Sequence, residues 1–307
     1  MASRQTSLAD RQVALTVFLL ISGMAVFGSA TPVTRIIGQD FPVMLAAEIR
    51  VLIGTLALLP LAWPHFRDLG KISRADWGRI GVIALFGMFG FSVLMLYGMR
   101  LIPGAAGAVV MSTAPAITAI GAIVFLGERL TRLKAGAIAL AVAGVMTLNL
   151  LNGGSGGGGQ LLIGTALVLA AVCCEAVYTL MGQRTTQDIS PVLVAFLAAA
   201  LSIPLFAPLA AWQMIGWDAG GVTARVWIAL AWYGAGTLAL GSWLWYAGIS
   251  RASGATAAGF MAVMPCSALV LSYVLLDEPF RWGHLAGFAI VLASVVLMSR
   301  EHAKMSA

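Results

Sequence analysis

Long apolar runs separated by short polar segments dominate the pattern along this chain of 307 residues. Ten of the runs are near the length of about 20 residues that a helix needs to cross a bilayer. They cover residues 13–36, 42–63, 77–100, 104–126, 132–151, 160–183, 190–212, 224–250, 254–276 and 282–299. The runs are too long and too uniformly apolar for transmembrane β-strands, whose side chains alternate over about ten residues. The pattern therefore predicts ten transmembrane helices.

Composition agrees, because the chain has too few charges to cover a soluble protein of this size. Hydrophobic residues make up 60% of the chain and charged residues 10%, whereas soluble domains contain about 25% charged residues. The net charge of +6 comes from basic residues scattered between the apolar runs. This scatter argues against a nucleic-acid-binding patch. We expect lipid to be the main solvent of the surface.

The basic residues also predict how the helices are oriented, since short loops rich in Lys and Arg stay in the cytoplasm. With a cytoplasmic N-terminus, 13 of the 18 basic residues fall in inside segments, 4 fall outside, and Arg50 lies within a span. Both termini are then cytoplasmic. The first run follows Arg4 and Arg11 as a signal peptide would, but it is longer than a signal core. We expect it to be a retained helix.

The second half of the chain repeats the first half. Identical residues at an offset of 150 are Gly98 and Gly248, Gly104 and Gly254, Met111 and Met261, Pro115 and Pro265, and Glu128 and Glu278. At an offset of 149, Arg35 matches Arg184 and Pro42 matches Pro191. We therefore expect two five-helix repeats, residues 1–151 and 160–307, joined by the glycine-rich linker 152–159.

An odd number of helices in each repeat gives the two repeats opposite orientations in the membrane. Inverted repeats are a common plan of secondary transporters, in which the substrate binds near the midplane between the repeats. The sequence thus predicts an all-α integral membrane protein, with ten helices in two inverted repeats around a central cavity. The glycine-rich linker lacks the G-K-[ST] of a phosphate loop, so we expect gradients to drive transport.

Several segments resemble the EamA family of the drug/metabolite transporter superfamily. They are FLGERLTRLKAGAIALAVAGVM at 125–146, its looser copy LLDEPFRWGHLAGFAIVLASVVLM at 275–298, FGSATPVTR at 27–35 and LAAEIRVLIGTLAL at 45–58. Within the superfamily, the chain resembles the bacterial exporters of aromatic amino acids and metabolites of the YddG type. The resemblance implies ten helices around a central cavity, alternating access, and export of amino acids and related metabolites across the bacterial inner membrane. It implies no cofactor, and as partners a small-molecule substrate and the bilayer, with no nucleic acid and no need for an oligomer.

Three charged residues interrupt the apolar spans: Glu48, Arg50 and Glu175. A charge at the bilayer centre costs about 2.5–3.5 kcal/mol on insertion scales, and it is usually paired or faces a cavity. The corresponding positions of the other repeat are the uncharged Leu197, Ala199 and Val26. We expect these charges to bind the two charged groups of an amino acid, or a coupled proton. The structural alternatives stay open: a helix lock by Arg50, solvation of Glu48 at the outer interface, and a hydrogen bond that holds the helix of Glu175.

Other candidates are aromatic residues and prolines. Tyr97, Tyr178, Trp243 and Tyr246 would form a stacking wall for organic substrates or an interfacial belt. Pro115 and Pro265 fall within spans, where matched kinks would make hinges or cavity walls. Glu128 and Glu278 follow the fourth and ninth spans, and we expect each to cap the start of the next helix.

The pattern favours a transporter over an enzyme. Every aspartate lies in a loop or near a span end, and the three histidines are peripheral, so no catalytic constellation stands out. Cys173, Cys174 and Cys266 lie in apolar runs without metal-ligand spacing, which favours simple packing. A metabolite channel or a lipid flippase on the same frame is the alternative. Neither a catalytic nor a metal site is expected.

Overall fold

The computed structural model describes residues 2–126, 158–186, 189–249 and 263–279, together with isolated positions in 131–143, 251, 260 and 281–293. These residues are helical or lie in turns, and no strand occurs among them. Two of the predicted spans, 132–151 and 282–299, lie largely outside the described residues, as do Glu128 and most of the linker. The total of ten helices therefore stays a prediction.

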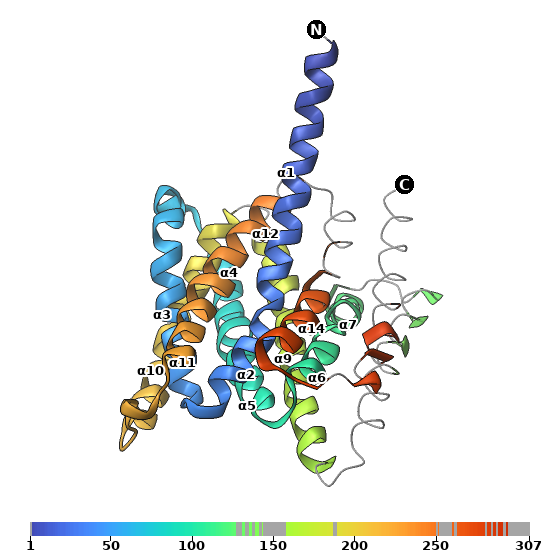
Figure 1. The fold of residues 1–307 in the computed structure, drawn as a ribbon. Coiled ribbons are helices and arrows are strands. Elements are labelled where there is room, and N and C mark those ends of the chain that lie inside the picture. Colours follow the sequence, from blue (N-terminus) through green and yellow to red (C-terminus); the bar gives the residue numbers. More distant parts are fainter. Residues whose placement is uncertain are drawn as a thin grey trace.

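The described helices form a bundle from which the start of α1 projects (Figure 1). The first half contains α1 (Ala2–Gly28), α2 (Ala30–Asp40), α3 (Val43–Ala62), α4 (Arg74–Val82), α5 (Phe91–Leu101), α6 (Gly104–Met111) and α7 (Ala114–Leu126), with a 3-10 helix at Trp63–Lys71 and the π-helix η2 at Ile83–Gly90. The second half contains α9 (Gly158–Thr185), α10 (Pro191–Met214), α11 (Ala224–Ala231), α12 (Gly241–Ile249) and α14 (Val263–Leu276), with a 3-10 helix at Ala219–Gly221 and the π-helix η4 at Trp232–Leu240.

Within the described residues, six helical stretches are long and apolar enough to cross a membrane. They are Ala14–Gly38, Val43–Lys71, Arg74–Leu101, Gly104–Gly121, Gly159–Gly182 and Pro191–Met214, and Val263–Leu276 is a shorter apolar helix. A further helical run is made of α11, η4 and α12 and covers the eighth predicted span. The expectation of an all-helical chain with several membrane-spanning helices is confirmed.

Prolines mark where several of these helices begin. Pro42 and Pro103 directly precede α3 and α6, and Pro191 is the first residue of α10. A proline lacks the amide hydrogen that a helix start leaves unbonded, so it suits this position. Pro115 is the second residue of α7, after a turn at residues 112–113 that interrupts the fourth predicted span. Pro265 lies in α14, whose described part begins at Val263. The role of the two prolines as hinges or cavity walls stays a prediction.

The first span is also broken, between α1 and α2 at Ser29. Gly28 lies so close to α14 that an added Cβ would meet the Met264 carbonyl oxygen at 2.3 Å and Ser267 Oγ at 1.9 Å. The Ser29 hydroxyl accepts a hydrogen bond from Trp232 Nε1 at 2.8 Å. Close packing by a glycine, and a bond from the opposite half, hold this break in place.

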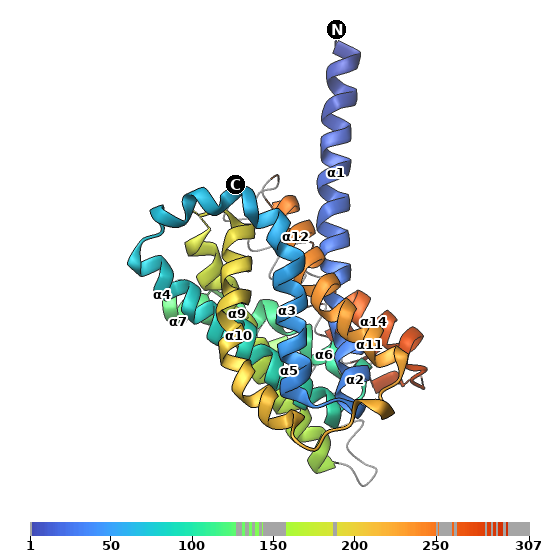
Figure 2. The same cartoon turned by 90° about the vertical axis from the view of Figure 1, so that its left-hand side faces the viewer.

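Contacts between helices recur from one half to the other. α5 packs against α9 as α1 packs against α12, and α10 packs against η2 as α3 packs against η4. α3 and α10 contact each other along their length, which Figure 2 shows from the side. This is the pattern of contacts expected when two equivalent halves face each other. The inverted relation of the halves stays a prediction.

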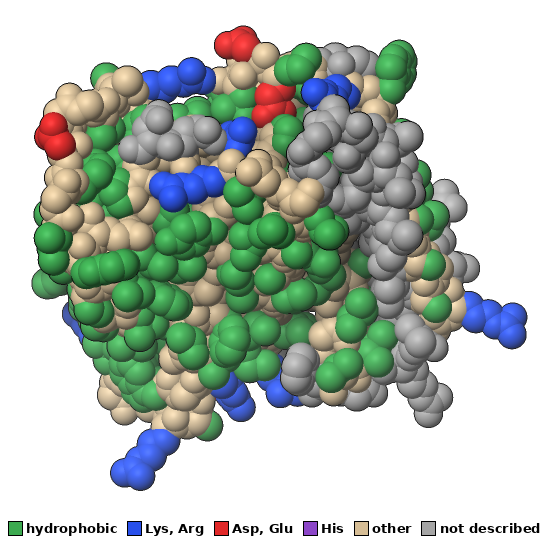
Figure 3. Space-filling model, turned by 90° about the horizontal axis from the view of Figure 1, so that it is seen from below, with side chains coloured by type: hydrophobic (Ala, Val, Ile, Leu, Met, Phe, Trp, Pro, Cys, Tyr) green, Lys and Arg blue, Asp and Glu red, His purple; other side chains and the backbone are tan. Residues whose placement is uncertain are grey.

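Apolar side chains fill two cores and also cover the outside. One core includes Phe41, Phe206 and Tyr233, and the other includes Met95, Met99 and Val168. Large apolar side chains also face outward, such as Leu56, which is 67% exposed, and Ile228, which is 70% exposed. Outward-facing apolar side chains of this size suit lipid contact. Figure 3, which views the bundle from its lower end, shows apolar side chains over much of that end, together with Lys and Arg side chains.

Candidate functional site

Arg50 of α3 lies inside the bundle, with contacts from both halves. Its side chain is buried, and its NH1 donates a hydrogen bond to Ser92 Oγ of α5 at 2.5 Å. Its guanidinium carbon lies 4.4 Å from the ring centroid of Tyr233 in η4 and 5.8 Å from that of Phe91 in α5. A guanidinium over a desolvated aromatic ring gains about 2 kcal/mol.

Glycines bring η4 close enough to α3 for this contact. A Cβ added at Gly234 would lie 2.8 Å from the Arg50 carbonyl oxygen and 2.7 Å from Ile53 Cβ. A Cβ added at Gly54 would lie 2.5 Å from Leu238 Cδ2. Larger residues at either position would separate the two helices, and with them Tyr233 and Arg50.

A second part of the site is a tyrosine pair that joins α9 to α12. The hydroxyl oxygens of Tyr178 and Tyr246 lie 2.5 Å apart and share a hydrogen bond, and Ser242 approaches the Tyr178 hydroxyl. Tyr178 also packs against η2, since a Cβ added at Gly87 would lie 2.8 Å from Tyr178 Cβ.

Glu175 lies one helical turn before Tyr178, so the two share a face of α9. Its Oε2 atom is buried and has no hydrogen-bond partner in the described part of the chain. The charges of Glu175 and Arg50 both act on the Tyr178 hydroxyl. We call Arg50, Ser92, Glu175, Tyr178, Tyr233, Ser242 and Tyr246 the central cluster.

The charges of the central cluster have no ion-pair partner among the described residues. The ion pairs found there are Lys71–Asp68, at 2.8 Å, and Arg79–Asp76, at 2.6 Å. Arg50 Nε is also buried without a hydrogen-bond acceptor. An unpaired buried charge costs several kcal/mol. The cluster therefore has an unused capacity to bind charged groups.

Both π-helices border the central cluster. η2 and η4 occupy equivalent positions of the two repeats, at offsets of 149 and 150. Tyr233 lies within η4, and Ser92 and Ser242 each come two residues after a π-helix, at an offset of 150 from each other. π-Helical turns in otherwise regular helices are frequent at functional sites.

The structure brings together some of the sequence-predicted residues and leaves others apart. Arg50, Glu175, Tyr178 and Tyr246 belong to the central cluster. Glu48 is 8% exposed, and its Oε2 atom is buried without a partner, but no described contact joins it to the cluster.

The other predicted residues lie elsewhere. Tyr97 contacts Arg100, whose guanidinium carbon is 5.8 Å from its ring, and Trp243 is 40% exposed. Pro265 of α14 is buried. Pro115 begins α7, and its side chain is outside the described part of the structure.

Sequence reasoning did not select Phe91, Ser92, Tyr233 or Ser242 as site residues. Ser92 and Ser242 are small, uncharged and common in membrane helices. Their identical position in the two repeats was a signal that could have found them. Tyr233 carries no such signal, since its role follows from the close packing of η4 on α3.

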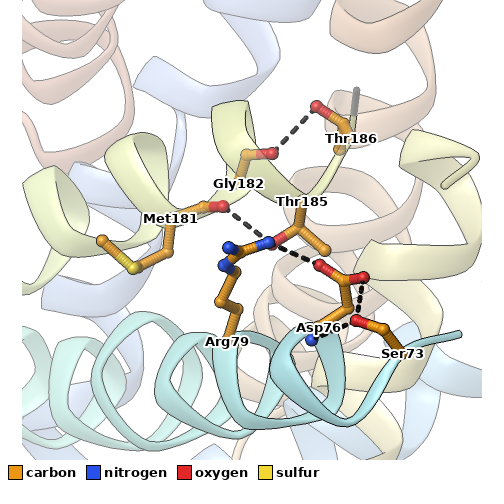
Figure 4. Close-up of polar contacts among 7 residues, drawn as sticks. All are labelled: Ser73, Asp76, Arg79, Met181, Gly182, Thr185 and Thr186. Carbon is orange, nitrogen blue, oxygen red and sulfur yellow. Dashed lines mark hydrogen bonds and ion pairs between the residues drawn. The ribbon is translucent and has the colours of Figure 1, made fainter. Parts of the chain in front are cut away.

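Towards one end of the bundle, polar contacts lie where the start of α4 meets the end of α9 (Figure 4). Ser73 caps α4 by accepting from the Asp76 amide at 3.1 Å. Arg79 points from α4 toward the end of α9 and is paired with Asp76. In the described residues, no group of three or more His, Cys, Asp or Glu side chains is arranged to hold a metal ion.

Comparison with known proteins gives related transporters. The chain is 30% identical over 277 residues, which are 90% of it and 84% of the relative, to "Uncharacterized transporter YetK" of Bacillus subtilis. It is 25% identical, over 93% of both chains, to "Probable terminal-alkyne amino-acid exporter" of Streptantibioticus cattleyicolor. A solved crystal structure matches with a TM-score of 0.61 at 17% identity, over 92% of this chain and 95% of the other, which supports the fold alone.

A family model described as the EamA-like transporter family matches the chain twice, at residues 14–150 and 162–300. The two matches correspond to the two halves that repeat each other in the sequence. Together with the apolar membrane-crossing helices, they assign the whole bundle to one class of membrane protein. The chain belongs to the EamA-like transporter family.

Proposed function

We propose that this transporter exports amino acids, including aromatic ones, and related small metabolites from the cytoplasm by alternating access. The central cluster is the substrate site in this proposal. The observation that carries it is a pair of opposite charges, on Arg50 and Glu175, that act on the same tyrosine. Each has a buried atom, Arg50 Nε and Glu175 Oε2, without a hydrogen-bond partner, and neither forms an ion pair among the described residues. A substrate that brings both charges would compensate both residues.

An amino acid has the complementary groups. Its carboxylate would accept hydrogen bonds from the Arg50 guanidinium, whose Nε has no acceptor in the described structure. Its ammonium group would donate to the free Oε2 of Glu175. Charge-assisted hydrogen bonds of this kind are strong inside a protein, because the surrounding dielectric constant is low.

Aromatic side chains surround these charges. Tyr178, Tyr233, Tyr246 and Phe91 are contributed by α9, η4, α12 and α5. Aromatic rings provide large apolar surfaces that stack against other rings. This supports amino acids with aromatic or bulky apolar side chains as substrates.

The direction of transport is inferred from the family and from one relative. The Streptantibioticus protein is described as a probable amino-acid exporter, and it matches this chain over 93% of its length. The repeat of contacts between the halves supports a mechanism in which the two halves exchange their arrangements.

Counterflow in reconstituted vesicles tests the proposal. Vesicles containing the protein are loaded with unlabelled phenylalanine, and the transient uptake of labelled phenylalanine is measured. A carrier gives a saturable overshoot that competing amino acids abolish. The matched competitors are phenylethylamine, which lacks the carboxylate, and phenylpropionate, which lacks the ammonium group; each should compete more weakly than phenylalanine.

Three outcomes would contradict the proposal. Flux that does not saturate and shows no overshoot would indicate a channel. Movement of labelled lipid headgroups without amino-acid counterflow would indicate a flippase. Equal competition by phenylalanine and its two analogues would show that the charges of Arg50 and Glu175 do not recognise the substrate.

A further inference from the structure

Two arginines join the ends of α2 and α5 at one end of the bundle. Arg35 of α2 donates from NH1 to the carbonyl oxygens of Met99 at 2.6 Å and Arg100 at 2.7 Å, at the end of α5. Arg100 in turn donates to the carbonyl oxygens of Gly38 and Phe41, at the end of α2, the latter at 2.5 Å. Each arginine therefore satisfies carbonyl groups that the other helix leaves unbonded at its C-terminus.

Glu278 adds a contact between the halves at the same end. It follows α14, and its two carboxylate oxygens accept from the amides of Gly104 at 2.5 Å and Ala105 at 2.9 Å, at the start of α6. We had expected it to cap the next helix in sequence, but it caps a helix of the other repeat. Its charge also acts on Arg35. We call this end of the bundle the Arg35 face.

The repeat counterpart of Arg35 lies at the other end of the bundle. Gly164 of α9 packs beside Leu101 on the Arg35 face, and Arg184 comes 20 residues later in the same helix. At 1.5 Å per residue, this places Arg184 about 30 Å away, across the thickness of a hydrocarbon core. We call this end the Arg184 face.

Arg184 is exposed, and no hydrogen bond or ion pair joins it to the described residues. By the repeat offset, the end of α12 corresponds to the end of α5, and Ile249 to Met99. α2 packs along α5, whereas the described contact between α9 and α12 is the hydroxyl pair of Tyr178 and Tyr246. The two faces therefore differ: the arginine of one holds a helix end, and the arginine of the other bonds none of the described residues.

We propose that Arg35 and Arg184 are alternating latches, positioning residues that each hold one face of the transporter closed. In the arrangement described here, the Arg35 latch is closed and the Arg184 latch is open. In the opposite arrangement, Arg184 bonds carbonyl groups at the end of α12, and Arg35 releases the end of α5. This inference deepens the proposed function, since it names the contacts that would exchange during alternating access.

The Arg35 latch has more supporting contacts than the Arg184 latch, and this difference suits export. The Arg35 face has two further contacts, from Arg100 and Glu278, and the repeat counterpart of Arg100 is a serine, Ser250. The neighbouring Arg251 bonds Ala247 of its own helix. With the predicted cytoplasmic termini, the Arg35 face is external. The resting protein would then be closed outside and ready to load from the cytoplasm.

Amide hydrogen exchange of the substrate-free protein in lipid nanodiscs tests the latches. The variants are Arg35→Gln, Arg184→Gln and the control Arg225→Gln, which removes an arginine that donates to a different helix end, at Leu275. The readout is exchange in residues 36–42 and 98–105. Arg35→Gln should speed this exchange about tenfold or more, because it removes the two charge-assisted hydrogen bonds by which α2 holds the end of α5. Arg184→Gln should slow exchange in these residues, because the substitution weakens only the opposite arrangement. Arg225→Gln should leave the exchange unchanged.

Exchange that is unchanged in Arg35→Gln, or that all three variants speed equally, would overturn the proposal. If Arg35→Gln speeds exchange along the whole chain, this variant has lost its fold and does not test the latches. Arg184→Gln then provides the test. Slower exchange in residues 36–42 and 98–105 supports the latches, and unchanged or faster exchange contradicts them. No substrate is needed. Failure of phenylalanine counterflow in the wild type would therefore refute the proposed substrate and leave this result intact.

Discussion

Replacement of Arg50 by glutamine should separate binding of substrate from stability of the fold. The guanidinium gains about 1.5–3 kcal/mol from its charged hydrogen bond to Ser92 and about 2 kcal/mol from the Tyr233 ring. Against these gains stands the desolvation of a charge with no carboxylate partner, which costs several kcal/mol. Because these terms nearly cancel, Arg50→Gln should change the free energy of unfolding by less than about 2 kcal/mol.

Transport should respond much more strongly than stability. A charge-assisted hydrogen bond to a substrate carboxylate is worth about 1.5–3 kcal/mol, so its loss should raise the half-saturating phenylalanine concentration about 10- to 150-fold. Phenylethylamine has no carboxylate, and its competition should hardly change. Arg50→Lys keeps the charge but loses the planar group that stacks on Tyr233, and it should lie between wild type and Arg50→Gln.

The assay is phenylalanine counterflow with phenylethylamine as competitor, with thermal unfolding of the same detergent-solubilised variants. The reasoning would be refuted if Arg50→Gln weakened the binding of phenylalanine and the competition by phenylethylamine to the same extent. A large fall in melting temperature with unchanged half-saturation would also refute it, and would show that Arg50 locks α3 to its neighbours.

Three further predictions concern other parts of the molecule. Glu175→Gln should fold and insert normally while transport falls or loses its pH dependence, and normal kinetics and pH response would leave Glu175 a structural role. A cysteine at Ser3, in a variant without native cysteines, should be unreachable by an impermeant thiol reagent added outside intact cells, and labelling from outside would disprove the cytoplasmic N-terminus. Gly28→Ala should lower the melting temperature, because its Cβ would lie 2.3 Å from the Met264 carbonyl oxygen. Gly78→Ala is its control, since nothing lies within 4 Å of that Cβ, and equal melting temperatures would contradict the close contact.

Part of the candidate site could be predicted because charge is rare in lipid. Arg50 and Glu175 stood out from the apolar runs on the cost of burial alone. Tyr178, three residues after Glu175, shared a face of the same helix. Ser92 and Tyr233 could not be selected in this way, because neither is unusual in its own segment and both act through Arg50, which is 42 residues from Ser92 in the chain.

The sequence by itself determined that the chain is helical, crosses the membrane several times and contains two copies of one unit. In lipid, every backbone group must be bonded within its own segment, so a long apolar run leaves little choice but a helix. Duplication keeps the spacing of its glycines, prolines and glutamates, so the repeat can be seen without coordinates.

Only the tertiary structure decided which of these helices meet and which way their side chains face. Trp243 and Tyr246 are three residues apart, yet Trp243 is 40% exposed and Tyr246 bonds Tyr178. Glu278 was expected to cap the next helix, but it caps α6. It accepts from the amide of Ala105, which is 173 residues away in the chain. A carboxylate bonds whichever helix start lies within reach, and a ring turns toward whichever helix packs beside it. Those neighbours are set by glycine contacts such as Gly234 on Arg50, which depend on distances in space and leave no periodic trace along the chain.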